Sequence, residues 1–317
     1  MRADGLAFVF PGQGSQTVGM LSDLVENFPV ATELFAMASA RLDYDLLSLC
    51  LSGPEQKLNQ TEYTQPALLT AGYAVWRIWH DLGGARPDFL AGHSLGEYTA
   101  LVCAGVLDFS DAVGLVAERG RFMQDAVPHG VGAMAAVSGL DDDVVVDACA
   151  RAAQDEIVSA ANFNFPGQVV IAGNAKAVDR ASDLAKAAGA RRVTPLSVSV
   201  PAHCRLMAPA AHRLQQRFDE IDFMPAAIPV VQNIDALART DPDEIKQALI
   251  LQIHQPVLWS ECIAVMQENG ITRIVECGPG KVLSGLIRRI DKNLDCRSIS
   301  DTESLNVTLS TGNTAGR

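Results

Sequence analysis

The chain has 317 residues, of which 48% are hydrophobic, and 25 basic against 37 acidic side chains give it a formal net charge of −12. This length can bury a large core in one large or two smaller domains, and the negative charge argues against nucleic acid or an anionic membrane as partner. No apolar run reaches the roughly 18 residues of a membrane span, and seven scattered cysteines without a Cys-x-x-Cys pair argue against disulfides and zinc, so we expect a cytoplasmic protein without a metal site.

The first predicted element is a strand at residues 7–9, which runs into the glycine-rich loop FVFPGQGSQ at residues 8–16. Glycines after a strand can bring backbone N–H groups close to an anion. The loop lacks the Lys-Ser/Thr pair of a phosphate-binding loop after Gly14, and Thr17 stands where a dinucleotide-binding loop needs its third glycine. The sequence of this loop alone therefore leaves its role open.

A second strand is predicted at residues 89–91, directly before a Gly-x-Ser-x-Gly motif at residues 92–96. An apolar helix at residues 98–103 follows. In this context the glycines permit a sharp turn that lifts the serine hydroxyl out of the sheet, at the positive end of the helix. We predict that Ser94 is a nucleophile; the alternative is a chance match in an ordinary strand-to-helix turn.

A helix is predicted at residues 110–124, where apolar residues recur at helical spacing, and Arg119 falls on the apolar face. A guanidinium cannot be buried without an anion, because desolvating it is costly. Either an internal carboxylate such as Glu97 pairs with it, or the partner arrives with the substrate. In the second case the guanidinium would bind a substrate carboxylate through two parallel hydrogen bonds.

The middle of the chain has the order β-α-β-β-α-β of a ferredoxin-like fold, with strands at 133–137, 157–160, 169–172 and 193–198 and helices at 142–153 and 175–188. Later apolar strands are predicted at 228–231 and 274–275, and they repeat the strand, turn and helix pattern that is typical of an open parallel sheet. We therefore predict an α/β fold in which a mostly parallel sheet carries an inserted α+β subdomain. The predicted units are a large domain at 1–128 and 200–300, the small subdomain at 129–199, and a flexible polar tail at 301–317.

A serine hydroxyl needs a base to become a nucleophile, so one of the six histidines is expected beside Ser94. His203 and His254 both stand in predicted loops. Spacing favours His203, which follows the last strand of the insert. No Asp or Glu stands near either histidine as an obvious orienting group, so we expect a backbone carbonyl in that role.

Six stretches of the chain, taken together, resemble the malonyl-CoA:acyl carrier protein transacylases of bacterial fatty acid synthesis. They are FVFPGQGSQTVGM, GHSLGEYTALVCAGV, ERGRFMQ, NFPGQVVIAGN, SVPAHC and ECGPGKVL, in this order. The resemblance covers roughly residues 6–290. It implies a hydrolase-like α/β domain with a ferredoxin-like insert, in agreement with the predicted division.

The resemblance also implies a role for each of six residues. Ser94 becomes malonylated, His203 is its base, and Arg119 holds the malonyl carboxylate. The main-chain carbonyl of Gln252 orients His203, and the backbone N–H groups of Gln13 and Leu95 form the oxyanion hole. The opening loop would then serve a developing alkoxide and not a phosphate.

The substrates implied are malonyl-CoA and acyl carrier protein with its phosphopantetheine arm. We expect no tightly bound cofactor, and we expect the enzyme to be a monomer. The product would supply fatty acid synthesis; a polyketide system could use it too. Because acyl carrier proteins are acidic, docking needs a basic patch on this acidic chain. The candidates are Arg191, Arg192, Lys281, Arg288, Arg289 and Lys292.

Two rival functions share part of this pattern. A serine esterase or thioesterase would have the same turn and histidine but would release its acid to water, and it would not want the cation Arg119 in its acyl pocket. A non-catalytic module that binds carrier protein would not need Ser94, His203 and Arg119 together. The three residues therefore favour the transferase.

Overall fold

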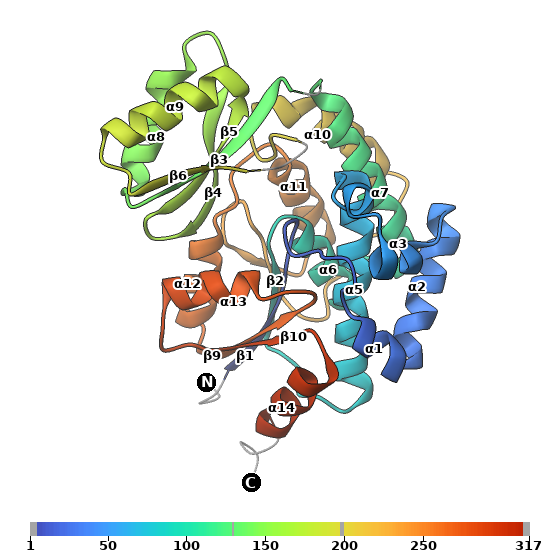
Figure 1. Cartoon of the computed structure of the whole chain (residues 1–317). Helices are drawn as coiled ribbons and strands as arrows, with labels where there is room; N and C mark the ends of the chain where they lie inside the picture. Colours follow the sequence, from blue (N-terminus) through green and yellow to red (C-terminus); the bar gives the residue numbers. More distant parts are fainter. Residues whose placement is uncertain (1–4, 129, 197–199, 313–317) are drawn as a thin grey trace.

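The computed structural model of the chain describes residues 5–128, 130–196 and 200–312 (Figure 1). A six-stranded sheet has the order β10-β9-β1-β2-β7-β8, and every neighbouring pair is parallel except β7 with β8. Its strands are β1 (Gly5–Phe10), β2 (Phe89–Gly92), β7 (Val230–Val231), β8 (Ala238–Arg239), β9 (Ile271–Cys277) and β10 (Asp295–Ile299). The prediction of a mostly parallel sheet is confirmed.

Strand β1 is buried along its whole length, as expected for a central parallel strand covered on both faces. Its alternate residues serve two different cores. Phe8 and Phe10 join the core on the face with most of the helices, whereas Ala7 and Val9 join the core of the opposite face. Small residues on the second face let its two helices pack close to the sheet.

The larger core is built with helices α1 (Ser22–Asn27), α2 (Pro29–Leu42), α3 (Leu46–Ser52), α4 (Glu55–Leu58), α5 (Thr61–Asp81), α6 (Leu95–Cys103), α7 (Phe109–Ala126), α10 (Ala208–Phe218) and α11 (Pro242–Gln252). The opposite core is built with α12 (Trp259–Glu268) and α13 (Val282–Ile290). Figure 1 shows these two groups on either side of the sheet. The helix predicted around Arg119 is confirmed as α7, and it is slightly longer than expected.

A second sheet, antiparallel and of four strands, lies beside the first, at the top of Figure 1. It has the order β4-β5-β3-β6, with β3 (Gly132–Ser138), β4 (Val158–Phe165), β5 (Gln168–Asn174) and β6 (Arg192–Pro195). Helices α8 (Asp142–Ala153) and α9 (Ala175–Ala187) cover one face of it. The β-α-β-β-α-β prediction is confirmed. The predicted domain borders remain predictions, since residues 129 and 197–199, which flank them, lie outside the described part.

The chain end departs from the expected flexible tail, because α14 (Thr302–Gly312) is helical. Asp301 caps it by accepting the Ser304 N–H at 2.7 Å, and the backbone N–H of Thr302 donates to Asp23 at 2.6 Å. Leu305 is fully buried in the larger core. The expectation was therefore wrong for residues 302–312, where one cap and one buried leucine outweigh a polar composition; residues 313–317 lie outside the described part.

All seven cysteines are unpaired, and six of them are buried. Within residues 5–128, 130–196 and 200–312, no group of His, Cys, Asp and Glu side chains is arranged to hold a metal ion. None of the helices described here combines the length and the apolar character that crossing a membrane requires.

Candidate active site

Ser94 lies in the tight turn between β2 and α6, with φ 52° and ψ −105°. The chain can turn here only because both neighbouring motif positions lack a side chain. A Cβ on Gly92 would overlap the backbone of Gly96, and one on Gly96 would overlap the carbonyl oxygen of Phe10 at the end of β1. The turn therefore presents the serine hydroxyl at the end of the central strands, as predicted.

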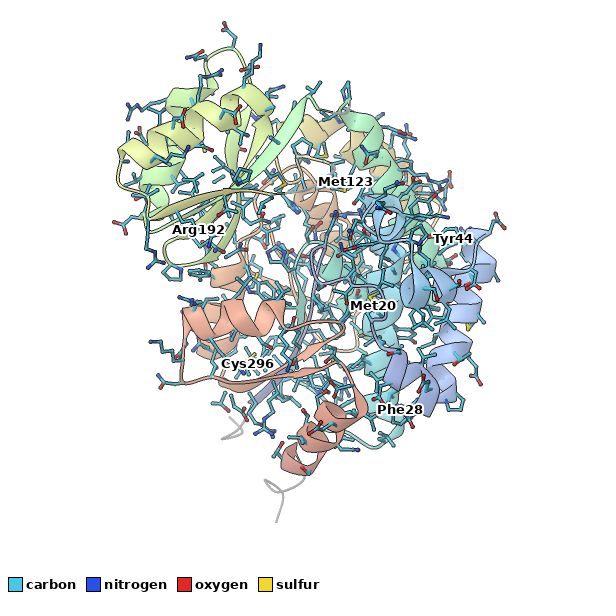
Figure 2. The ribbon with its side chains drawn as sticks, in the orientation of Figure 1. Met20, Phe28, Tyr44, Met123, Arg192 and Cys296 are labelled. Carbon is cyan, nitrogen blue, oxygen red and sulfur yellow. The ribbon has the colours of Figure 1, made fainter. Side chains whose placement is uncertain are left out.

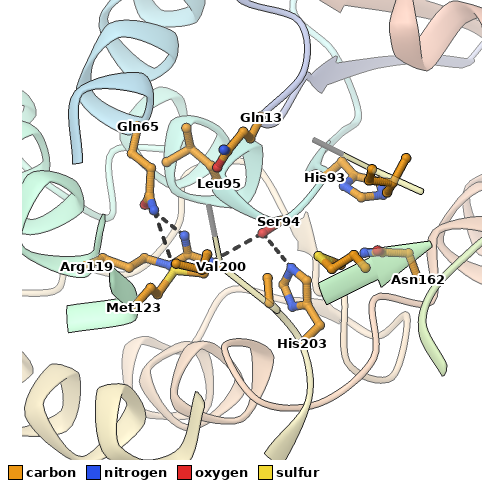
Figure 3. Close-up of a pocket in the computed structure, with 13 residues that line it drawn as sticks. Gln13, Gln65, His93, Ser94, Leu95, Arg119, Met123, Asn162, Val200 and His203 are labelled. Carbon is orange, nitrogen blue, oxygen red and sulfur yellow. Dashed lines mark hydrogen bonds between the residues drawn. The ribbon is translucent and has the colours of Figure 1, made fainter. Parts of the chain in front are cut away.

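His203 lies in the segment that leads from the small sheet to the 3₁₀ turn η1 (Arg205–Met207), and its Nε2 is 2.8 Å from Ser94 Oγ (Figure 3). Its Nδ1 is 2.7 Å from the backbone carbonyl oxygen of Gln252. A carbonyl oxygen can only accept, so Nδ1 carries the hydrogen and Nε2 is free to accept from the serine. The structure thus brings together the three groups that the sequence named; His254 instead contacts the carbonyl of Ile250.

The imidazole of His203 is buried, with 3% of its surface exposed. Burial, together with the nearby charge of Arg119, lowers the pKa of His203 to about 3. The side chain is therefore neutral at physiological pH. A neutral imidazole is the form that can take a proton from the serine.

Arg119 extends from α7 into the same cavity with 1% of its surface exposed. Its terminal nitrogens donate to Gln65 Oε1 at 2.8 Å, to Gln252 Oε1 at 3.1 Å and to Ser94 Oγ at 3.3 Å. Burial lowers its pKa from the ordinary value. Each of these partners is uncharged, and the guanidinium carbon also lies 5.2 Å from the centre of the Tyr98 ring, so neutral groups alone surround the charge among the described residues.

The internal ion pair with Glu97, one of the two alternatives for Arg119, does not form. Glu97 is fully buried in the first turn of α6, where Oε2 accepts the backbone N–H of Asn233 at 2.8 Å and Oε1 has no partner. Burial raises the pKa of Glu97 to about 8. No carboxylate in the described part of the chain forms an ion pair with Arg119. Of the two alternatives, the internal carboxylate partner is therefore wrong.

Gln13, in the loop after β1, and Leu95, the first residue of α6, both line the cavity beside Ser94 (Figure 3). Their backbone N–H groups have no hydrogen-bond partner among the described residues. The loop can approach the turn closely because a Cβ on Gly12 would overlap the carbonyl oxygen of His93. The Gln13 side chain is tied down by Thr61 Oγ1, which donates to its Oε1 at 2.9 Å. Two free amides beside a serine hydroxyl can hold an oxyanion.

Several polar groups of the site were missed in the sequence. Gln65 stands in the apolar helix α5 and is 1% exposed, and Asn233, after β7, is fully buried. The Gln252 side chain also takes part, since its Nε2 donates to the Ser94 carbonyl at 2.9 Å. A glutamine inside an apolar helical run was the one signal that could have revealed Gln65 and Gln252, because buried amides need partners.

The cavity around Ser94 has a volume of about 130 Å³. Figure 3 shows Arg119 and Gln65 on one side of Ser94, and His93 and Asn162 on the other. Met123 and Val200 supply apolar wall. One end of the cavity can therefore take an anion and the remainder a neutral chain.

The six basic residues named for carrier docking are exposed and lie outside this cavity. Arg191 and Arg192 stand at the edge strand β6, and Arg192 is labelled in Figure 2. Arg288 and Arg289 form the last turn of α13, Lys281 precedes that helix, and Lys292 follows it. Helix α13 packs against β4 of the small sheet, whereas Arg191 and Arg192 stand at the opposite edge of that sheet, on and just before β6.

The fold and the site together define an α/β acyltransferase with a buried serine–histidine pair. The family model of the acyl transferase domain matches residues 7–302. The chain belongs to this family.

Similar proteins carry more specific names. A malonyl CoA-acyl carrier protein transacylase of Escherichia coli K12 is 52% identical over 303 residues, which cover 96% of this chain and 98% of that protein. A solved acyl carrier protein S-malonyltransferase of Vibrio cholerae is 55% identical, with a TM-score of 0.94 over 96% of this chain and 99% of that one. A malonyl-transacylase solved in complex with a type II polyketide acyl carrier protein is 51% identical, with a TM-score of 0.96 over 97% of this chain and 100% of that one.

Proposed function

We propose that this protein transfers a malonyl group from malonyl-CoA to acyl carrier protein through a malonyl-Ser94 intermediate, and so supplies malonyl thioester for fatty acid synthesis. The observation that carries the proposal is a buried arginine with no carboxylate partner in the described part of the chain, 3.3 Å from the hydroxyl that His203 contacts. Malonyl-CoA brings both a thioester and a free carboxylate. Its carboxylate would pair with Arg119, and its thioester carbonyl would lie beside Ser94.

In the first half-reaction, Ser94 Oγ attacks the thioester carbonyl carbon while His203 Nε2 takes the hydroxyl proton. The backbone N–H groups of Gln13 and Leu95 stabilise the oxyanion of the tetrahedral intermediate; losing one such donor typically raises a barrier by about 3 kcal/mol. The intermediate then expels the thiolate of CoA, which takes the proton from His203. The Gln252 carbonyl keeps the imidazole in the required tautomer throughout.

In the second half-reaction, the phosphopantetheine thiol of the carrier gives its proton to His203 and attacks the ester carbonyl. Ser94 leaves with the proton that His203 returns, so each half-reaction ends with a neutral dyad. Arg119 would hold the malonyl carboxylate through both steps. A fixed acyl pose favours the thiol that arrives along the cavity over water.

For carrier docking, we propose two groups of exposed basic residues: Arg191 and Arg192 at the edge strand β6, and Lys281, Arg288, Arg289 and Lys292 on and around α13. These basic side chains would attract an acidic carrier even though the net charge of the chain is negative. We also propose that the enzyme acts as a monomer. Seven unpaired cysteines fit a reducing compartment, which supports the cytoplasm.

The deciding experiment is incubation of the protein with labelled malonyl-CoA, followed by mass mapping of the adduct. We expect a malonyl mark on Ser94 that moves to the thiol of added carrier protein, and no mark on the Ser94→Ala variant. Release of free malonate in place of the adduct would instead assign the protein to the thioesterases. A mark on another residue would contradict the proposed nucleophile.

A further inference from the structure

The turn that carries Ser94 needs an external hold. A residue with a Cβ rarely adopts φ 52° with ψ −105°, and such a conformation persists only where the surroundings fix it. The fully buried Asn233 side chain reaches both sides of this turn. Its Oδ1 accepts the Ser94 N–H at 2.7 Å, and its Nδ2 donates to the Gly92 carbonyl at 2.7 Å.

Asn233 is itself held at both backbone groups. Its N–H donates to Glu97 Oε2 at 2.8 Å, and its carbonyl accepts the Leu258 N–H at 2.8 Å. All four of its hydrogen-bonding groups are therefore used inside the protein. Because Glu97 lies in the first turn of α6, the contacts form a closed ring through β2, Ser94, α6 and the segment after β7.

The chemistry of the partners requires an amide at this position. The Ser94 N–H can only donate and the Gly92 carbonyl can only accept, so the side chain must accept at one end and donate at the other. A carboxylate would fail at Gly92, and an aliphatic residue would leave two buried groups unpaired. Loss of either bond would free the turn, and a displacement of about 1 Å at a reacting atom can cost about a hundredfold in rate.

We propose that Asn233 is a positioning residue for acyl transfer, holding the turn so that Ser94 Oγ stays in line with His203, while Glu97 holds Asn233 in turn. This inference rests on the proposed function, because it acts through Ser94. Asn233 is not among the residues that line the cavity. Its loss should therefore change turnover and leave substrate affinity nearly unchanged.

The test compares Asn233→Ala and Asn233→Asp with the wild type, with rates normalised to the folded fraction measured by circular dichroism. For Asn233→Ala we expect the single-turnover rate of Ser94 malonylation to fall at least tenfold at every pH, with KM for malonyl-CoA within threefold. For Asn233→Asp we expect the rate relative to wild type to fall as pH rises from 6 to 9. A protonated carboxyl can still donate to the Gly92 carbonyl, whereas an ionised one cannot.

Neighbouring titrations enter this comparison. Glu97 is bonded to Asn233, and Arg119, Asp235 and Arg239 act on Glu97 electrostatically. Measuring the wild type at each pH removes their common effect. The matched control is Asn174→Asp, because Asn174 Oδ1 likewise accepts a backbone N–H, from Ile157 at 2.8 Å, in the small sheet. It should keep the wild-type rate throughout.

The inference is overturned if folded Asn233→Ala acylates Ser94 within threefold of the wild type, or if Asn233→Asp keeps a constant fraction of the wild-type rate. Should the alanine variant fail to fold, the aspartate variant decides alone. A wild type that forms no malonyl-Ser94 would instead refute the proposed function. The two failures are thus distinguishable.

Discussion

Arg119 is the residue whose environment says most about the substrate, since a buried cation whose described partners are all neutral calls for an anion from outside. We expect Arg119→Ala to lower kcat/KM for malonyl-CoA by about thirtyfold or more, because truncating one partner of a buried charge pair costs about 2–5 kcal/mol. Acetyl transfer should survive or rise. Steady-state rates with both thioesters measure this.

The control for this experiment is Arg121→Ala, which removes an exposed guanidinium from the same helix. It should change neither rate appreciably. Equal losses of malonyl and acetyl transfer in Arg119→Ala would contradict a carboxylate clamp.

The basicity of His203 should depend on the same arginine. Burial and the charge of Arg119 disfavour the imidazolium, which places the pKa of His203 at about 3. Arg119→Gln removes the charge but can keep hydrogen bonds, so the pKa of His203 should rise. The acid limb of the kcat/KM profile for acetyl-CoA should then move to higher pH than in the wild type. An unmoved limb would show that the two side chains are not coupled.

Glu97 makes a separate prediction about stability. Its folded pKa of about 8 lies above the ordinary value of 4.5, so the folded state holds the proton more tightly than the unfolded state does. Stability from this group is complete below about pH 4.5 and is lost as pH rises toward 8. Glu97→Gln should therefore gain in melting temperature relative to the wild type between pH 5 and pH 8. A constant difference across thermal unfolding scans would contradict the raised pKa.

At the level of elements, α14 shows how a short buried contact can fix a polar segment. Leu305→Ala should reduce the free energy of unfolding by about 2–4 kcal/mol, as is typical for a buried leucine that leaves a cavity. Val307→Ala, at a side chain that is 52% exposed in the same helix, is the control and should have little effect. Urea denaturation measures both. Similar midpoints for the two variants would mean that α14 does not stabilise the core.

The elements that could be predicted were those whose pattern is local. Short apolar runs before glycine-rich turns predicted the strands around Phe8 and Leu90, and the order of elements predicted the ferredoxin-like insert. Helix α14 could not be found this way, because it depends on Leu305 entering a core made by distant helices.

In the candidate site, too, the local features could be predicted from the sequence and the long-range contacts could not. Ser94 lies in a contiguous motif and could be predicted directly, and spacing along the chain favoured His203. The Gly92–Ser94 contacts with Asn233 could not be inferred, since that residue is 139 positions from the serine and becomes relevant only when β2 and β7 pair. The sequence also could not show whether Glu97 and Arg119 form an ion pair, because that depends on their positions in the folded structure and not on their spacing along the chain.

For the whole molecule, docking of an acidic carrier can be tested on two flanks. Reversing Arg288 and Arg289 to Glu, or Arg191 and Arg192 to Glu, should raise KM for carrier protein by about tenfold, because like charges now face the partner. KM for malonyl-CoA should stay constant. The rise should shrink at high salt, since screening weakens exposed charges.

A matched charge change elsewhere controls for net charge. Arg121 and Arg213 stand on α7 and α10, on the far side of the molecule from α13 in Figure 1. Their reversal to Glu should leave KM for the carrier as it was. If reversal of this control pair raises KM as much as reversal of a docking pair does, the overall charge rather than a docking surface is responsible.

The buried guanidinium of Arg119 also affects the thermal stability of the protein. A desolvated cation that meets no carboxylate among the described residues weakens the empty fold, and the single carboxylate of an entering malonyl thioester would relieve this. Thermal tolerance of this enzyme should thus track the supply of its own acyl donor, so that a cell rich in extender units keeps the catalyst intact for longer.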